Sequence, residues 1–315
     1  MSNGQLNVRD VQTRLARSME RWHAGENRMT HLSREEAMRY LGGELAPDEP
    51  PIDAMEAVAH RLHVQSTARR LTMRARAAGP AQATELDWRA HNGQNYITSV
   101  KLQGACGTCT CFSSAAATEA AICIATNTPP QTVNGAEYPD LSEAQMFYCG
   151  AASQGRTCNS GWFLPAAFDF LTTSGVAPES YFPYTSGDQS CGVKTGWESV
   201  ATKITGQTKM ATPDDARTWL LEKGPIAAML VAYQDLFTYV SGVYRHVSGD
   251  RLGVHSMCII GFSETQQAWL CKNSWSDEWG EKGYIWMEFG QCGIESAMRG
   301  INGLALINGK PQAAK

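Results

Sequence analysis

The amino-acid sequence predicts an α+β protein with two lobes, one helical and one rich in strands, preceded by a helical N-terminal segment. Three observations support this prediction. Apolar residues recur at steps of three and four in the first 85 residues, which is the spacing of one helix face. Further helical segments extend to about residue 200. Short apolar runs typical of strands then follow from residue 226.

Three helices are expected in the first 85 residues. The first is marked by an apolar stripe that consists of Val8, Val11, Leu15, Met19 and Trp22. Residues 33–36 read Ser-Arg-Glu-Glu, a capping box, and open a short second helix that ends at two glycines, residues 42–43. After a Pro-rich linker, residues 55–62 belong to a third helix, which continues to Arg76 before Gly79 and Pro80.

Residues 86–315 are expected to form one unit with two halves. The helices of the first half are expected at residues 110–126, 142–148 and 164–174. The strands of the second half are expected at residues 226–232, 255–262, 268–272 and 283–289. A helical lobe and a sheet lobe would meet at a cleft. A site in this cleft would draw its side chains from both walls.

The composition is that of a globular protein and argues against two classes of partner. Hydrophobic residues make up 43% of the chain and charged residues 18%. The net charge of −4 and the pI near 6.0 offer no basic surface to nucleic acid. No uninterrupted apolar run approaches the ~18 to 20 residues that a membrane span needs. We therefore expect neither nucleic acid nor a membrane as a partner.

Two features of the sequence point to different compartments. Residues 1–9 have neither the basic head and apolar core nor the cleavage site of a secretory signal peptide. This favours a cytoplasmic protein, or one exported by a non-classical route. Ten cysteines are instead typical of an oxidising compartment. The sequence does not decide between the two.

Cys109 is the candidate nucleophile, because it directly precedes the Ala-rich helix of residues 110–126. A helix N-terminus offers free N–H groups and about half a positive charge, which favours a thiolate and lowers a cysteine pKa. Three alternatives remain: a structural thiol or disulfide half, a thioredoxin-like Cys-x-x-Cys pair with Cys106, and zinc ligation with Cys106 and Cys111. No second cluster of suitable spacing favours zinc.

His255 and Asn273 are the candidate partners of this thiol. Only two histidines follow the candidate nucleophile; His246 lies in a polar, turn-like stretch, whereas His255 opens a predicted strand that would hold its ring rigidly. Asn273 would accept a hydrogen bond from the second ring nitrogen and fix the tautomer. Trp275 and Trp279 are expected to shield this bond from water, or simply to fill the core.

These residues resemble the papain (cathepsin-like) family of cysteine peptidases. The resemblance rests on the run Gln-Gly-Ala-Cys-Gly-Thr-Cys at residues 103–109, on His255, and on Asn273 in Lys-Asn-Ser-Trp, and it covers about residues 86–301. It implies a papain-like two-lobed fold and hydrolysis of peptide bonds through a thioester on Cys109, with no cofactor and no metal. It also implies that Gln103 forms the oxyanion hole together with the backbone N–H of the nucleophile.

The resemblance also implies a substrate-binding wall. Residues 158–162, Cys-Asn-Ser-Gly-Trp, are similar to the family segment in which a glycine pairs with the substrate backbone as an edge strand would. We therefore expect bulky hydrophobic side chains to be preferred two places before the scissile bond. The residues assigned to this wall are Ser160, Gly161, Trp162, Phe163, Met229, Gly253, Ser256 and Ala297. Some of them are alternatively core residues.

Further implications concern cysteines and departures from the family pattern. The resemblance implies two disulfides, Cys106 with Cys158 and Cys149 with Cys191. Thr110 stands where the family usually has tryptophan, which predicts an altered site but removes no catalytic group. Residues 292–296 resemble cathepsin B, yet no histidine-bearing insert that would support exopeptidase activity is present, so an endopeptidase is expected.

Residues 1–85 are expected to be an inhibitory propeptide that covers the cleft of its own chain, which makes the protein a zymogen. This expectation rests on position and helicity, since the usual pro-region pattern does not fit residues 14–29. The alternatives for these residues are a helical docking module or a structural part of the mature enzyme. For the whole chain, the alternatives are a catalytically silent papain-like protein that binds a peptide or a partner, and a thioester-based transferase or ligase.

Overall fold

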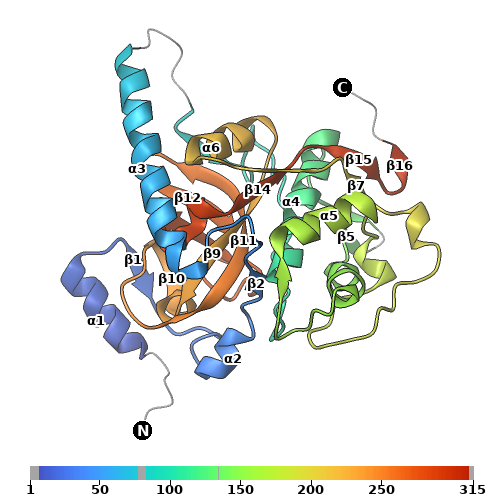
Figure 1. The fold of residues 1–315 in the computed structure, drawn as a ribbon, viewed down its shortest axis with the longest axis horizontal. Helices are drawn as coiled ribbons and strands as arrows, with labels where there is room; N and C mark the ends of the chain where they lie inside the picture. The colour runs from blue at the N-terminus through green and yellow to red at the C-terminus, as the bar shows by residue number, and fades with distance from the viewer. Residues whose placement is uncertain (1–6, 77–82, 134, 312–315) are drawn as a thin grey trace.

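The computed structural model describes residues 7–76, 83–133 and 135–311, and it has two lobes packed side by side with the N-terminal segment against them (Figure 1). The helices are α1 (Val8–Ser18), α2 (Arg34–Met38), α3 (Ile52–Arg76), α4 (Cys109–Thr126), η1 (Gln145–Ala151), α5 (Leu164–Thr173), η2 (Glu179–Tyr181), η3 (Trp197–Ser199), α6 (Pro213–Glu222), η4 (Gln234–Thr238) and η5 (Gln291–Ser296). The strands are β1 (Trp22–Ala24), β2 (Gly43–Glu44), β3 (Glu85–Asp87), β4 (Gln131–Val133), β5 (Ala136–Tyr138), β6 (Trp162–Phe163), β7 (Lys203–Ile204), β8 (Gln207–Lys209), β9 (Ile226–Tyr233), β10 (Tyr239–Tyr244), β11 (Arg251–Ser263), β12 (Ala268–Lys272), β13 (Tyr284–Glu288), β14 (Met298–Ile301), β15 (Leu304–Ile307) and β16 (Lys310–Pro311). The predicted α+β class is confirmed.

The sheet lobe is built on the largest sheet of the described residues, which has nine strands. Their order is β1-β10-β13-β12-β11-β9-β14-β8, and β3 pairs with β11 as well. Neighbours are antiparallel except β10 and β13, which are parallel. The long strand β11 lies between β9 and β12, where its side chains are almost all buried. His255 therefore sits on a long, buried strand that is paired on both sides.

The helical lobe packs around α4, the helix that begins at Cys109. Most residues of α4 are buried, because the helix lies against β11 and β9 on one side and α5 on the other. This burial accounts for a helix that is apolar all round. By length and composition alone, α4 is also apolar enough to cross a membrane, but 72% of it is buried inside the protein. The predicted helix at residues 142–148 is present as the wider π-helical turn η1.

The first two N-terminal helices are present but shorter than predicted. α1 ends at Ser18, because Met19 adopts a left-handed conformation with φ of 52° and is 88% exposed. The prediction that Met19 and Trp22 extend the helical stripe was therefore wrong, and Trp22 instead opens β1. The capping box at residues 33–36 is confirmed by reciprocal hydrogen bonds of Ser33 and Glu36, 2.8 and 3.2 Å long. α2 ends at Met38, before the two glycines.

The third helix, α3, reaches Arg76 as predicted, while Gly79 and Pro80 lie outside the described residues. Two short N-terminal strands were not predicted. β1 adds to the edge of the main sheet beside β10, and β2 pairs with β6 of the helical lobe. The N-terminal segment is thus joined to both lobes by backbone hydrogen bonds.

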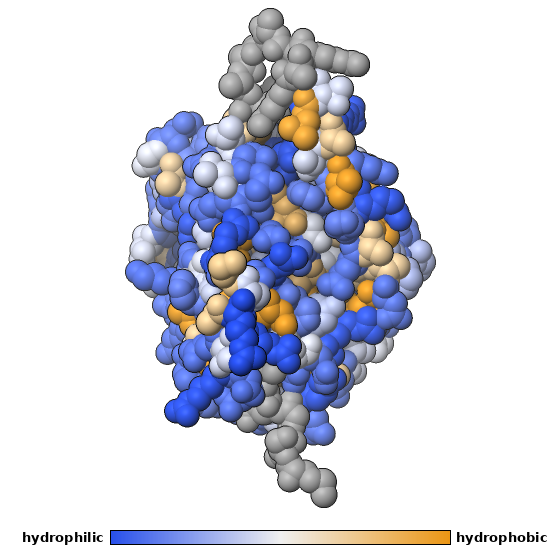
Figure 2. All heavy atoms as spheres, turned by 90° about the vertical axis from the view of Figure 1, so that its left-hand side faces the viewer, coloured by the Kyte–Doolittle hydropathy of each residue, from blue (hydrophilic) through white to orange (hydrophobic). Residues whose placement is uncertain are grey.

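The outer face of the molecule on the side of α1 and α3 is mostly hydrophilic, with scattered small groups of apolar side chains (Figure 2). The residues of α1 that are buried are the apolar Val8, Val11 and Leu15. On α3, Met55 and Ala59 are fully buried, whereas Val64 and Leu71 are exposed. The N-terminal segment therefore turns much of its apolar surface toward the two lobes, as a bound domain would.

Candidate active site

Cys109 is the first residue of α4 and is fully buried. Backbone hydrogen bonds from Gly42, Ser256 and Thr110 act to lower the pKa of its thiol, but burial acts more strongly and raises this pKa to about 11. The sequence predicted a lowered pKa at this helix N-terminus, and for the buried thiol of this structure that prediction was wrong. The cause is desolvation, which favours the neutral thiol.

His255 lies on β11, and its ring is oriented by Asn273. The Nε2 atom is 2.7 Å from Oδ1 of Asn273, and this same Oδ1 accepts the backbone N–H of Ser274 at 2.8 Å. Because the oxygen of an amide side chain carries no hydrogen and can only accept, Nε2 must carry the proton toward Asn273. In the neutral ring Nδ1 is therefore unprotonated. Among the described residues, this buried Nδ1 has no hydrogen-bond partner. The ring thus presents a free basic nitrogen.

Two buried tryptophans lie over this pair. The ring of Trp275 is 4.6 Å from the ring of His255, and Trp279 packs edge-on against Trp275 at 5.1 Å. Both indoles are fully buried, so they fill core space and also keep water from the imidazole. Burial lowers the pKa of His255 to about 4, although the hydrogen bond to Asn273 acts in the opposite direction. The covered site therefore favours a neutral thiol and a neutral imidazole.

Gln103 is fully buried and its amide is fixed from both ends. Its Oε1 accepts the hydroxyl of Ser274 at 2.7 Å, and its Nε2 donates to the carbonyl of Cys106 at 2.8 Å. The same Nε2 also donates to the carbonyl of Tyr40 at 3.1 Å. The donor that was predicted for the oxyanion hole thus already holds a carbonyl oxygen, and this oxygen comes from the N-terminal segment.

One side of the expected substrate wall is occupied by β2. The N–H of Trp162 donates to the carbonyl of Gly42 at 3.0 Å, and β2 runs parallel to β6 with Gly43 opposite Trp162. Gly161, with φ of 62°, lies so close that a Cβ there would be 2.1 Å from the Gly42 oxygen. Glu44 pairs with Phe163 in the same ladder.

The side chains of this first wall have more varied surroundings. The indole of Trp162 is buried in the helical lobe, where its Nε1 donates to Gln154 at 2.9 Å. Ser160 is engaged in a turn with Thr157, whose N–H donates to the serine hydroxyl at 2.9 Å. Their backbones therefore border the wall, while the Trp162 side chain supports it from behind.

The opposite side of the cleft comes from the sheet lobe. A Cβ on Gly43 would lie 2.9 Å from the end of the Met229 side chain, and one on Gly253 would lie 3.4 Å from Leu41. Ala297 is fully buried, and its carbonyl accepts the N–H of Met229 at 2.9 Å. Met229 and Gly253 thus lie against residues 41–43 of the N-terminal segment, and Ala297 lies beside Met229.

Ser256 is placed differently from the rest of the expected wall. It is 1% exposed, and its hydroxyl lies 2.7 Å from the hydroxyl of Ser113 on α4. The side chain therefore faces the helical lobe and not the cleft.

The contribution of residues 40–44 was missed by sequence reasoning, although two adjacent glycines marked the place. They were interpreted as a helix stop. The structure gives a different reason for Gly42, because a Cβ there would lie 2.0 Å from the backbone oxygen of Gly107. Only glycine permits this approach of two backbones.

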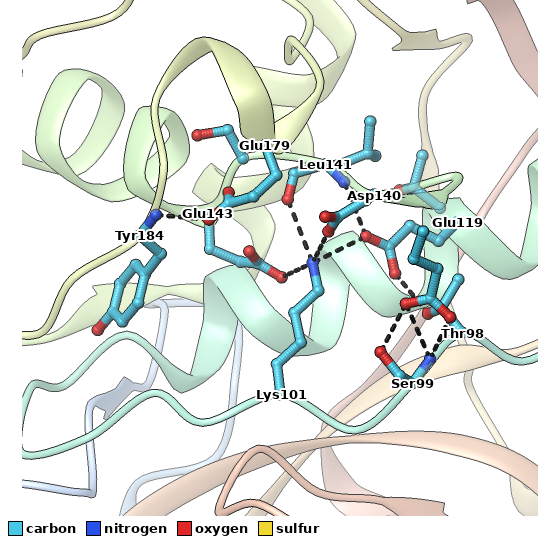
Figure 3. A network of polar contacts seen from close by, with 12 residues as sticks. Thr98, Ser99, Lys101, Glu119, Asp140, Leu141, Glu143, Glu179 and Tyr184 are labelled. Carbon is cyan, nitrogen blue, oxygen red and sulfur yellow. Dashed lines mark hydrogen bonds and ion pairs between the residues drawn. The ribbon is translucent and has the colours of Figure 1, made fainter. Parts of the chain in front are cut away.

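A buried charge network behind the site was also missed, because its members are dispersed along the chain. The Lys101 ammonium lies among the carboxylates of Glu119, Asp140 and Glu143, at 3.1, 2.6 and 2.8 Å (Figure 3). Glu119 belongs to the helix that begins at the candidate nucleophile, and Lys101 lies two residues before Gln103. The network therefore fixes the Gln103 segment against α4.

Two disulfides stabilise the helical lobe, Cys106–Cys158 and Cys149–Cys191. They are the pairings that the resemblance implied. Cys106 and Cys158 belong to the segments that carry Gly107 and Gly161, and both of these glycines lie against Gly42. The N–H of Gly107 also donates to the carbonyl of Cys158 at 2.9 Å. The other described cysteines are free and buried.

Comparison with known proteins identifies the class to which this fold and site belong. The family model described as "Papain family cysteine protease" matches residues 82–301. The chain belongs to the papain family of cysteine proteases.

Individual relatives agree with this assignment. The chain is 33% identical over 226 residues to "Digestive cysteine proteinase 2" of Homarus americanus, which covers 69% of this chain and 65% of the relative. It is 30% identical over 233 residues to "Pro-cathepsin H" of Mus musculus, with 70% and 64% covered. The chain thus spans a little under two thirds of the length of these relatives.

The solved structure of procathepsin B S9 from Trypanosoma congolense matches with a TM-score of 0.72, at 21% identity, over 99% of this chain and 100% of that one. The match extends through the N-terminal segment. The predicted papain-like two-lobed fold with a preceding helical segment is confirmed.

Proposed function

We propose that this protein is a cysteine endopeptidase that hydrolyses peptide bonds through Cys109, His255, Asn273 and Gln103, and that residues 1–85 hold it inactive as a zymogen. The observation that carries the proposal is the His255–Asn273 contact of 2.7 Å, which leaves Nδ1 of the ring free as a base. The hydrogen bond from the Ser256 backbone to the Cys109 thiol supports it, because Ser256 directly follows His255.

In the proposed reaction, Nδ1 of His255 takes the proton of the Cys109 thiol, and the sulfur forms a bond to the carbonyl carbon of the substrate. The resulting oxyanion is held by Nε2 of Gln103 and the N–H of Cys109. His255 then gives its proton to the leaving amine as the C–N bond breaks, which leaves a thioester. Water, deprotonated by His255, cleaves the thioester and restores the thiol. Asn273 keeps the ring in the required tautomer throughout.

Residues 40–44 support the proposal of self-inhibition. The Tyr40 carbonyl is bonded to the Gln103 Nε2 that an oxyanion would need, and Gly42 lies against the thiol and the N–H of Trp162. A substrate that pairs with the 161–163 edge must therefore displace this segment. The boundary that we propose, between residues 85 and 86, is supported by a family match that begins nearby, at residue 82.

The test of the proposed function is a comparison of peptide hydrolysis with thiol labelling. The full chain, opened at low pH, should hydrolyse a fluorogenic peptide with a bulky hydrophobic residue two places before the cut. An epoxide that alkylates thiolates should stop the hydrolysis and add its mass to the peptide that contains Cys109. A silent peptide-binding or partner-binding protein would show neither effect. A transferase or ligase would react at the same cysteine but give amide products, which mass spectrometry would detect.

Acid should weaken the covering of the site. In the covered form the pKa of His255 is lowered from 6.5 to about 4, so this group stabilises the covered form above pH 6.5 and the stabilisation is lost as the pH falls toward 4. The pKa of Cys109 is raised from 9.0 to about 11, so its contribution is lost only as the pH rises above 9. The covered form should therefore be most stable between these two limits.

Hydrogen exchange at the amide of Trp162, corrected for its intrinsic pH dependence, would measure this opening. We expect opening to increase by up to about a hundredfold between pH 7 and pH 4, since each unit of pKa shift is tenfold. His255→Asn, which does not titrate in this range, should lose most of the increase. Exchange with the same pH dependence in both proteins would contradict the assignment to His255.

A further inference from the structure

A buried hydrogen bond connects the element that carries the candidate nucleophile to the element that carries the candidate base. The hydroxyl oxygens of Ser113 and Ser256 are 2.7 Å apart, and the two residues are 3% and 1% exposed. Ser113 lies on α4, four residues after Cys109, and Ser256 lies on β11 directly after His255. The bond thus spans the two walls one residue away from the imidazole and one helical turn away from the thiol.

The local geometry explains how this contact arises. Residues four apart on a helix lie on the same face, so Ser113 and Cys109 both face β11. On β11, Ser256 faces α4, and the ring of the preceding residue, His255, packs against Trp275. The backbone N–H of Ser256 also reaches the Cys109 thiol. Ser256 therefore contacts α4 at two points, through its hydroxyl at Ser113 and through its backbone at Cys109.

The other partners of the two hydroxyls are more distant. Ser113 lies 3.2 Å from the carbonyl of Thr110, and Ser256 lies 3.3 Å from the carbonyl of Ala228. Each serine is thus the nearest hydrogen-bond partner of the other. Both also border a small cavity of about 10 Å³ that Asn273 lines as well.

We propose that the Ser113–Ser256 hydrogen bond is a positioning contact that sets the separation between the Cys109 sulfur and the His255 ring, an inference that rests on the proposed function. Neither hydroxyl touches the reacting atoms in this role. The bond holds α4 and β11 in a fixed relative position, so that the thiol proton can pass directly to Nδ1. A shift of about 1 Å between such groups can lower a rate by about a hundredfold.

The test uses Ser113→Ala, Ser256→Ala and the double variant in the full chain, all opened at low pH in the same way. Each single variant should lower kcat by about tenfold with KM nearly unchanged, because the substrate wall is not altered. The alkylation rate of Cys109 by iodoacetamide should shift its pH profile toward higher pH, because the imidazole supports the thiolate less well. The double variant should be no slower than either single variant, because both remove one bond.

Ser114→Ala is the matched control. Ser114 is also fully buried on α4, but its hydroxyl donates only to carbonyls of its own helix, Thr110 at 2.6 Å and Cys111 at 3.2 Å. It should leave kcat and the alkylation profile unchanged. Ser113→Thr, which keeps a hydroxyl, should retain most of the activity and shows whether a loss in Ser113→Ala reflects the bond or the fold.

Two results would overturn the inference in different ways. An active wild type with single variants that behave like Ser114→Ala, or with losses that multiply in the double variant, would refute the positioning role alone. A wild type that neither hydrolyses peptide nor is alkylated at Cys109 would refute the proposed function, and the positioning role with it.

Discussion

Cys109→Ala should lower the rate of peptide hydrolysis by at least about 10⁴-fold, which is the scale of loss when a nucleophile is removed from a catalytic triad. The sulfur is the atom that would form the thioester, and alanine offers no substitute. The fold should be preserved, because Cys109 sits at the start of α4 and alanine is a good helix former. The measurement is kcat/KM for a fluorogenic peptide, with circular dichroism to verify the fold.

The matched control for this variant is Cys111→Ala. Cys111 is also free, fully buried and on α4, but it packs in the core of the helical lobe. Residues two apart on a helix do not share a face, so this thiol points away from the cleft. Cys111→Ala should keep near-normal kcat/KM at some cost in stability. Hydrolysis that survives in Cys109→Ala and disappears in Cys111→Ala would mean that the nucleophile was assigned wrongly.

Gly42→Ala should release the self-inhibition of the uncut chain. The added Cβ would lie 2.0 to 2.2 Å from the oxygen, carbonyl carbon and Cα of Gly107, all of them backbone atoms that cannot rotate away. Residues 40–44 would then have to leave the cleft, which frees Nε2 of Gln103 and the edge strand at residues 161–163. We expect the activity of the uncut chain to rise by at least about tenfold, since each 1.4 kcal/mol of lost contact is tenfold.

The assay for Gly42→Ala is the initial rate at neutral pH, with the chain length verified on a gel so that cleavage is not the cause. Gly25→Ala is the control, because it lies in the same N-terminal segment but its Cβ would meet only the side chain of Val240 and no backbone atom. It should remain as silent as the wild type. If Gly42→Ala stays equally silent, residues 40–44 do not control access to the site.

The elements that could be predicted from the sequence are those specified by local pattern. α4 is marked by an Ala-rich stretch without Gly or Pro and β12 by a short apolar run, and their observed bounds differ from prediction by no more than one residue. The short motifs around Cys109, His255 and Asn273 likewise carry the resemblance to the family. In these cases the information lies within short windows.

The features that could not be predicted depend on contacts between distant segments. β1 and β2 have three and two residues, and each is a strand only because Trp22 pairs with Gly242 and Gly43 with Trp162. The raised pKa of Cys109 has the same origin, since a helix N-terminus lowers a thiol pKa only where water or charge can support the thiolate. Burial of Cys109 reverses that effect.

The place of β1 in the main sheet has a consequence for any processed form of the enzyme. Trp22 covers the aromatic rings of Tyr239 and Tyr244, at 6.1 and 5.0 Å, and both tyrosines are fully buried. If the whole N-terminal segment departs, β10 becomes the edge strand of the sheet. Its backbone amides on that side lose their partners, and the rings of Tyr239 and Tyr244 become exposed to solvent. Such an edge invites pairing with another chain. Removal of the whole segment would thus replace the β1–β10 pairing with an exposed edge that is prone to association. A cut enzyme that retained the first 24 residues would keep this edge paired.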